Sequence, residues 1–410
     1  MTAARRTIVH SARIVSDGTE DDGAWVALDA MADGARVVVA RGHGGGWRSH
    51  LRGDAHVVDA DGRAAVPGFV DLHCHGGGGA SAEDAARDPR ALPRILAVHR
   101  RHGTTRTMLS LVSAGVDALA ARIAALAPLV AADPLLLGVH LEGPFLAGSH
   151  RGAHRADALR PPTPDAVALL RDAGPVAMIT LAPELPGSSA AIDALVGAGV
   201  VVAIGHTAAD HGATRDAIAR GARVLTHAFN GMRGIHHRAP GPVVAAIEDQ
   251  RAVLELIVDG VHVHPSIVAG AVRAARGRVA FVSDAMAAAG AADGVYRLGD
   301  LDVTVRDGVA THGEDGALAG STLTLDRALA NAVAAGVPLV DAVDALTATP
   351  ARVLGLQGRI GSLAPGAAAD LVLLGAGGAP DAVWADGALV HAGPALCDRE
   401  RSRTTGAARS

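Results

Sequence analysis

The chain has 410 residues, of which 49% are hydrophobic, 2% are aromatic and 19% are charged, and its formal net charge at pH 7 is -5. This length is enough for one large α/β domain with a smaller domain beside it. The mixed charge and the scarcity of aromatic side chains exclude the basic, base-stacking surface that nucleic-acid binding requires.

The N-terminal stretch and the cysteines indicate the cellular setting. Residues 1–18 contain Arg5 and Arg6 but no sustained apolar core, so they do not predict a signal peptide. No apolar run reaches the ~20 residues that a membrane-spanning helix needs. Cys74 and Cys397 lie far apart and form no CxxC pair, which fits a reducing compartment. We therefore expect a cytoplasmic protein without membrane contact.

Short strands separated by turn residues are predicted at both ends of the chain. Near the N-terminus they are expected at 7–15, 24–28, 36–40 and 56–58, and near the C-terminus at 371–374, 382–384 and 388–391. Two β-rich ends of one chain can pair into a single sheet domain. We predict that residues 1–66 and 355–400 form a small β-sandwich domain and that residues 401–410 form a disordered tail.

Between these ends, apolar runs alternate with amphipathic segments rich in alanine and arginine, which is the pattern of repeated βα units. Helical segments are predicted after most runs, for instance at 83–102 and 209–220. The eight predicted strands are 68–72, 105–112, 135–140, 176–181, 200–204, 223–226, 253–258 and 279–282. Over residues 67–354 this indicates an α/β fold of the (β/α)8 TIM-barrel type, with a doubly wound open sheet as the alternative. Residues 286–320 interrupt the rhythm with turn-rich sequence to which the pattern assigns no role.

The first barrel strand leads into His73-Cys74-His75 and four glycines. Two histidines at i and i+2 of an extended segment point to the same side, so both can reach one metal ion at ~2.1 Å. An HxH pair alone is weak evidence, because solvent-exposed histidines give the same pattern. The pair becomes informative only together with the polar residues at the ends of the other strands.

Later strands are followed by more potential ligands. Glu142 ends the third strand just before Gly143-Pro144, and isolated burial of its charge would cost several kcal/mol, so it must face a cleft, a partner or a metal. His206 follows the fifth strand, His227 the sixth and Asp284 the eighth.

Each residue alone has a plainer explanation. His206 could cap a helix, His227 could be a buried core histidine, and Asp284 could be an N-cap. The carboxyl ends of parallel barrel strands lie on one face, however, so together these residues predict a divalent metal site. His140 points the same way as Glu142 and either supports that site or packs in the core.

Several motifs resemble the amidohydrolase superfamily over about Val66 to Leu374. They are VPGFVDLHCHG, GVHLEGPFL, AIGHTAAD, THAFNGM, VDGVHVHP, VSDAM, LAGSTLTLDRAL and GRIGSLAPGAAADLVLL. The PGxxDxHxH and GxxAD patterns are shared by the whole superfamily. The HLEGP stretch and THxxNxM are specific to the branch that deacetylates 6-phosphorylated amino sugars.

The resemblance implies a role for each site residue. Glu142, His206 and His227 hold a catalytic divalent metal, zinc or iron, and His73 and His75 hold a second ion bridged through Glu142, so one or two ions bind. Asp284 is the catalytic base and acid. His154 is catalytic and substrate-binding, because it contacts the acetyl carbonyl. The remaining substrate contacts are implied for Asn230, Gly231, Arg238 and His262.

The implied activity is hydrolysis of the acetamide of N-acetylglucosamine 6-phosphate to glucosamine 6-phosphate and acetate. The basic loop at 233–242 follows a metal ligand at the barrel mouth and favours an anionic substrate group over mere solvation. The resemblance also implies a homodimer, in which the protomer that supplies Arg238 is open. The alternatives are the galacto epimer, another amide, and a non-catalytic sugar-phosphate-binding protein.

Overall fold

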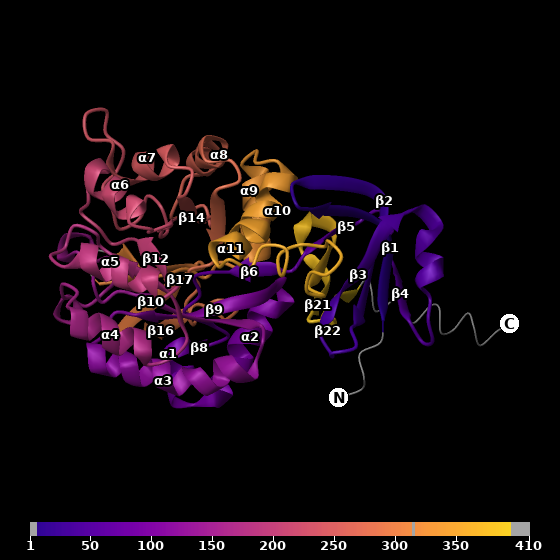
Figure 1. The fold of residues 1–410 in the computed structure, drawn as a ribbon, viewed down its shortest axis with the longest axis horizontal. Coiled ribbons are helices and arrows are strands. Elements are labelled where there is room, and N and C mark those ends of the chain that lie inside the picture. The colour runs from indigo at the N-terminus through magenta and orange to yellow at the C-terminus, as the bar shows by residue number, and fades with distance from the viewer. Residues whose placement is uncertain (1–5, 314–315, 395–410) are drawn as a thin grey trace.

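The computed structural model describes residues 6–313 and 316–394, and it comprises a barrel with a smaller sheet beside it (Figure 1). The predicted tail at 401–410 and Cys397 lie outside the described residues. No helix in the described part of the chain is long and apolar enough to cross a membrane.

Eight parallel strands form the barrel in sequential order. They are β6 (Phe69–Asp71), β9 (Thr104–Val112), β10 (Leu136–Glu142), β11 (Val176–Leu181), β12 (Val201–Ile204), β13 (Val224–Leu225), β14 (Val253–Ile257) and β15 (Val279–Val282). The first and last strands meet just beyond their ends, where Asp284 N donates to His73 O at 2.9 Å and Cys74 bridges to Ala285. The predicted (β/α)8 barrel is therefore confirmed, and the sequential order excludes the doubly wound alternative.

Helices cover the outside of the barrel (Figure 1). They are α1 (Ala82–Arg87), α2 (Leu92–Arg101), α3 (Val116–Ala132), α4 (Pro164–Asp172), α5 (Ser188–Gly197), α6 (His211–Ala219), α7 (Gly241–Glu248), α8 (Pro265–Ala274), α9 (Leu325–Ala334), α10 (Leu339–Leu346) and α11 (Ala348–Val353). The prediction of one helix over 83–102 is wrong. Pro89 disfavours helical geometry at Asp88, so α1 ends there and a short 3-10 turn (Pro89–Ala91) precedes α2.

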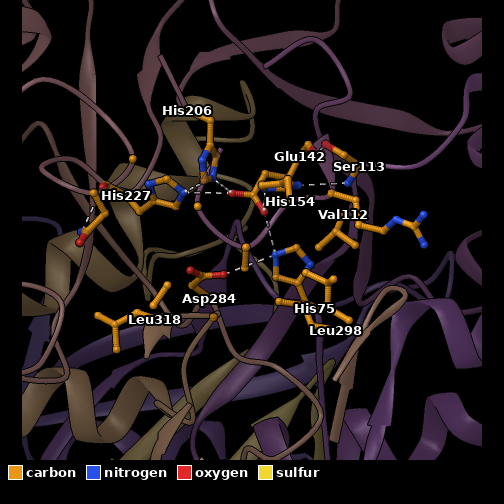
Figure 2. Close-up of a pocket in the computed structure, with 18 of the residues that line it drawn as sticks. His75, Val112, Ser113, Glu142, His154, His206, His227, Asp284, Leu298 and Leu318 are labelled. Atoms are coloured by element: carbon orange, nitrogen blue, oxygen red, sulfur yellow. Dashed lines mark hydrogen bonds and ion pairs between the residues drawn. The ribbon is translucent and has the colours of Figure 1, made fainter. Parts of the chain in front are cut away.

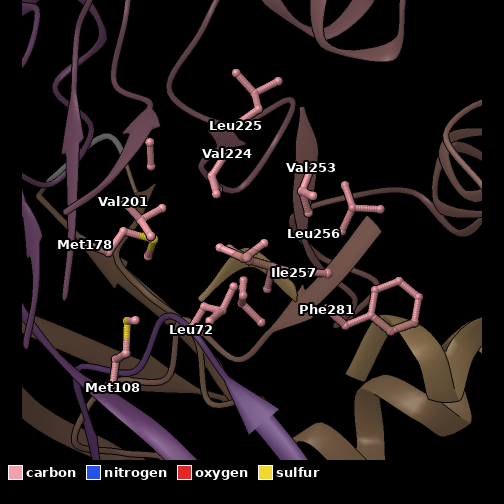
Figure 3. Packing of buried hydrophobic residues seen from close by; sticks show 14 of the residues in the cluster. Leu72, Met108, Met178, Val201, Val224, Leu225, Val253, Leu256, Ile257 and Phe281 are labelled. Carbon is pink, nitrogen blue, oxygen red and sulfur yellow. The ribbon is translucent and has the colours of Figure 1, made fainter. Parts of the chain in front are cut away.

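Aliphatic side chains and methionines fill the barrel core, since aromatic residues are scarce. Met108, Met178 and Val201 point into the barrel, while Leu256 and Phe281 point outward to the helices (Figure 3). This alternation follows from the two-residue period of a strand, and because both faces are covered the strands read as nearly continuous apolar runs.

The small sheet draws strands from both chain ends. They are β1 (Thr7–Ser16), β2 (Thr19–Ala30), β3 (Arg36–His43), β4 (His56–Asp59), β5 (Ala64–Pro67), β20 (Leu371–Leu374), β21 (Pro380–Ala385) and β22 (Ala388–Ala392). β20 pairs antiparallel with β5. The sheet curls, because Val38 N donates to Ala367 O at 2.8 Å and brings β3 against the segment before β20. Its two ends enclose a separate core that contains Trp384, as expected for the predicted β unit of both chain ends.

A four-stranded antiparallel sheet follows the last barrel strand. Its strands are β16 (Gly294–Leu298), β17 (Leu301–Arg306), β18 (Val309–His312) and β19 (Ala317–Leu318). A short hairpin of β7 (Gly76–Gly77) and β8 (Ala80–Ser81) follows the first barrel strand. Both elements lie at the carboxyl ends of the barrel strands, where the four-stranded sheet helps to enclose a cavity.

Candidate metal centre and substrate cavity

Three of the residues at the strand ends have an unusual backbone conformation. His206, His227 and Asp284 have φ values of 45°, 28° and 47°, in the left-handed region that non-glycine residues seldom occupy. Each lies two positions after the last residue of its barrel strand. Such strain persists only where the surrounding structure enforces it, and it concentrates at functional sites. Here it turns three side chains towards the barrel axis.

Glu142 lies at the middle of a cluster of histidines (Figure 2). Its Oε1 is 3.0 Å from Nε2 of His206 and 3.0 Å from Nε2 of His227, and these two nitrogens are 3.1 Å apart. We call these three residues the first ion position.

The other oxygen of Glu142 faces a second group. Oε2 is 3.3 Å from Nε2 of His75 and 3.7 Å from Nε2 of His73, and the two histidine nitrogens are 3.0 Å apart. Oδ1 of Asp284 is 3.4 Å from both nitrogens. We call His73, His75, Asp284 and this oxygen the second ion position.

The spacing in both positions fits a divalent cation. Ligands ~2.1 Å from an ion are about 3.0 Å apart at right angles and about 3.4 Å apart in a tetrahedron. Nδ1 of His206 donates to the carbonyl oxygen of His150 at 2.8 Å, which orients the ring with Nε2 towards Glu142. In the neutral ring Nε2 then carries a lone pair that can bind a cation.

The charges point the same way. Burial lowers the pKa of His75, but the carboxylates of Asp284 and Glu142 outweigh burial and raise it to about 10. Burial raises the pKa of Asp284, but His73 and His75 bring it down to about 2. Histidines likewise overcome burial and hold the pKa of Glu142 well below its usual range. Both carboxylates are therefore ionised, which is the state in which a carboxylate binds a metal ion.

His154 has a defined tautomer. Its Nδ1 accepts a hydrogen bond from the backbone N–H of Ser113 at 3.4 Å, and its Nε2 is 3.4 Å from Oε2 of Glu142. Burial lowers the pKa of His154 to about 4, so the ring is neutral near pH 7. The proton then sits on Nε2, where it faces the cavity and can be donated to an oxygen there.

His140 lies one layer below these residues. Its Nδ1 is 3.0 Å from the hydroxyl of Ser110 and its Nε2 is 2.9 Å from the hydroxyl of Thr180, which contacts Thr226 at 2.9 Å. Burial and the neighbouring His73 hold the pKa of His140 well below its usual range. A neutral, hydrogen-bonded layer therefore supports the cluster from beneath.

A cavity of about 220 Å³ opens over the cluster. Asn230, Gly231 and His262 line it, and His262 is held by Asp259 at 2.7 Å. Arg238 lies elsewhere, because its exposed side chain contacts the neighbouring His237 at 2.8 Å and does not line the cavity of its own chain.

Sequence reasoning missed two contributors. Leu298, Asp300 and Leu318 of the four-stranded sheet form one wall of the cavity, which gives residues 286–320 a position at the site. Glu255 lies fully buried beneath the cluster, 3.5 Å from Nδ1 of His73. A single acidic residue within the apolar run VLELIV is the signal that could have found it.

Comparison with known proteins gives consistent matches. A family model described as Amidohydrolase family matches residues 64–390. N-acetylgalactosamine-6-phosphate deacetylase of Escherichia coli O157:H7 is 37% identical over 341 residues, which cover 81% of this chain and 89% of that protein. N-acetylglucosamine-6-phosphate deacetylase of Homo sapiens is 35% identical over 332 residues, which cover 77% of this chain and 80% of that protein.

Solved structures agree in fold. A mutant N-acetyl-D-glucosamine-6-phosphate deacetylase from Mycobacterium smegmatis, in complex with N-acetyl-D-glucosamine-6-phosphate, superposes with a TM-score of 0.87 and 42% identity over 94% of this chain and 99% of that chain. The deacetylase from Thermotoga maritima gives a TM-score of 0.82 and 29% identity over 94% of this chain and 99% of that chain.

Proposed function

Since the chain belongs to the amidohydrolase family, we propose that it hydrolyses the N-acetyl group of N-acetylglucosamine 6-phosphate to give glucosamine 6-phosphate and acetate. The observation that carries this proposal is the position of Glu142, whose two oxygens face two pairs of histidines beside Asp284 in one cavity. An amide resists neutral water, so its hydrolysis needs an activated nucleophile, an acid for the leaving amine and a donor to the carbonyl oxygen.

Glu142, His206 and His227 would hold one divalent ion, and His73, His75 and Asp284 a second. Imidazole and carboxylate donors suit zinc or iron, and such an ion lowers the pKa of a bound water to roughly 7 and polarises a carbonyl. The family match and the close contacts among the candidate ligands of the two ion positions support a metal-dependent enzyme.

Asp284 and His154 would move and hold the protons. The ionised Asp284 accepts a proton from the attacking water and then gives it to the departing amine. His154 donates its Nε2 proton to the acetyl oxygen as negative charge develops there, an arrangement that Ser113 fixes from the other side of the ring.

The phosphate would lie against Asn230, Gly231 and His262. These residues line the cavity, and Asp259 raises the pKa of His262 against the effect of burial, which favours an imidazolium that attracts anions. Arg238 does not line the cavity of its own chain. We propose that it completes the phosphate site of the other protomer of a homodimer.

Because both substrate and product are charged and do not cross membranes, we also propose a cytoplasmic location.

A substrate panel tests the activity. The purified chain, loaded with Zn²⁺ or Fe²⁺, is assayed for acetate release from N-acetylglucosamine 6-phosphate, its galacto epimer and unphosphorylated N-acetylglucosamine. We expect the gluco phosphate to be the best substrate, with kcat/KM at least about 100-fold above the unphosphorylated sugar, because charge-assisted hydrogen bonds contribute about 1.5–3 kcal/mol each. A higher kcat/KM for the galacto epimer would support an N-acetylgalactosamine-6-phosphate deacetylase instead. If neither sugar phosphate releases acetate, both activities are refuted.

A further inference from the structure

Glu255 is a buried carboxylate that the proposed chemistry does not use. It lies in the middle of β14 (Val253–Ile257), its residue has 0% exposure, and its Oε1 has no hydrogen-bond partner among the described residues. A carboxylate buried without compensation costs several kcal/mol, so a glutamate within an otherwise apolar strand needs a physical reason.

The contacts of Glu255 link it to both ion positions. Its Oε2 is 3.5 Å from Nδ1 of His73 and also accepts the backbone N–H of His227 at 3.4 Å. The opposite nitrogen of His73, Nε2, faces His75 and Asp284 in the second ion position. Glu255 therefore contacts the ring of His73 on the edge that faces away from the second ion position.

This contact selects the state of the His73 ring. A carboxylate oxygen only accepts, so it favours the tautomer with hydrogen on Nδ1 and leaves the lone pair of Nε2 for a cation. A carboxylate behind a ligating histidine fixes the orientation of the ring and makes it a stronger ligand. Nδ1 of neither His73 nor His75 has a hydrogen-bond partner in residues 6–313 and 316–394, but Nδ1 of His73 lies at ion-pair distance, 3.5 Å, from Oε2 of Glu255.

We propose that Glu255 is a positioning residue that orients His73 and so determines whether the second ion position is filled. This inference rests on the proposed metal-dependent function, but it concerns ion binding and requires no turnover.

The test is a titration of the metal-free full chain with Co²⁺, followed by visible absorption and by the metal content after gel filtration. Wild type should bind two ions per chain. His73→Asn should bind one and supply the spectrum of the first position alone. Glu255→Gln keeps the shape of the side chain but loses its charge, and it should weaken the second ion about 10–100-fold while the first changes less than about threefold. The double variant should match His73→Asn, since Glu255 acts through that ring.

Glu83→Gln is the matched control. Glu83 is also a buried glutamate near the barrel mouth, and its Oε1 accepts the backbone N–H of Val112 at 3.2 Å, but it contacts no ring of the ion positions. It should bind both ions as wild type does, and equal melting temperatures of the metal-free variants would show intact folding.

Three results would overturn the inference. They are one ion in wild type, equal weakening of both ions by Glu255→Gln, and a second ion unaffected by it. If two ions bind as expected but no substrate of the panel releases acetate, the inference holds and the proposed function fails.

Discussion

At the scale of single residues, Glu142 joins two ligand groups because its two oxygens point in different directions. Oε1 meets His206 and His227, and Oε2 meets His75, at 3.0–3.3 Å. Glutamine at this position would keep one acceptor but lose the charge that both groups share. The centre is therefore one coupled unit, and single substitutions are expected to have non-additive effects.

Asp284→Asn removes the proposed base while keeping its size. We expect kcat to fall about 1,000-fold, within the range that general acid–base catalysis contributes. The measurement is the steady-state rate of acetate release, with metal content determined on the same samples. Asp302→Asn, an exposed position on β17, is the control and should keep full activity. Retention of more than a tenth of the wild-type kcat by Asp284→Asn would rule out this role.

Residue positions at the site were partly predictable. Glu142, His206, His227 and Asp284 stand at or just after apolar strands, and the order of parallel strands brings such ends to one face. Their catalytic roles stay predictions. The acidic residue within VLELIV singles out Glu255, but its partner was not predictable, since His73 is 182 positions away in the sequence. The position of Arg238 depends on loop geometry that sequence spacing does not determine.

At the scale of elements, the β16–β17 hairpin forms part of the cavity wall. Leu298 ends β16, and Gly299 at the turn has a φ of 57°. A methyl group on Gly299 would overlap Cγ2 of Val112, which also lines the cavity. The hairpin can approach the barrel only because this position lacks a side chain.

Gly299→Ala should displace the hairpin from Val112 and raise KM about tenfold, equivalent to about 1.4 kcal/mol, with a smaller change in kcat. Gly308→Ala is the matched control in the next turn of the same sheet. It has a φ of 74°, so the backbone strain is similar, but an added Cβ would meet only Thr322 Oγ1 at 3.6 Å. The test is to measure KM and kcat of both variants by steady-state kinetics. An equal rise of KM in both would contradict the claim that the β16–β17 hairpin forms part of the cavity wall.

Elements were predictable where their pattern was strong. The strands at 176–181, 279–282 and 371–374 were predicted with the bounds they have in the structure. β13 keeps only two paired residues, because the chain turns sharply into the strained His227. The sequence pattern of residues 286–320 did not predict that they contribute to the site. Part of this stretch forms a small antiparallel sheet, and that sheet packs against Val112, which is distant in the sequence.

At the scale of the whole molecule, the two ion positions gather residues from five barrel strands, including both sides of the β6–β15 seam. Metal removal should therefore lower global stability. At a metal concentration 100-fold above Kd the expected stabilisation is about 2.7 kcal/mol per ion. Melting curves with and without a chelator measure it. In Glu142→Gln, which lacks the shared ligand, the melting temperature should no longer respond to the chelator.

The contact between sheet and barrel has its own pH dependence. Asp344 of α10 accepts the backbone N–H of Gly18 at 3.2 Å, and burial raises the pKa of this carboxyl above its ordinary value of 3.8. The folded state thus binds more protons than the unfolded state between these two pKa values, so stability falls as pH rises through that window and stays lower above it.

Asp344→Asn keeps the acceptor without the charge. It should be more stable than wild type at pH 7, and the difference should shrink at pH 4, as measured by urea midpoints. Asp216→Asn, at an exposed position of α6, should show no such trend. A stability difference that is the same at both pH values would contradict the raised pKa of Asp344.

The domain boundaries at residues 66/67 and 354/355 stay a prediction, although the contact of Asp344 with Gly18 lies between the sheet and the barrel helices.

The pairing of β5 with β20 also constrains synthesis on the ribosome. Residues 65–67 pair with residues 371–373, and at 5–20 residues per second the intervening ~300 residues take roughly 15–60 s to translate. Throughout that time the nascent β5 exposes an unsatisfied strand edge, which is a template for aggregation. The sheet that β1–β5 begin is therefore completed only after the barrel strands have been synthesised.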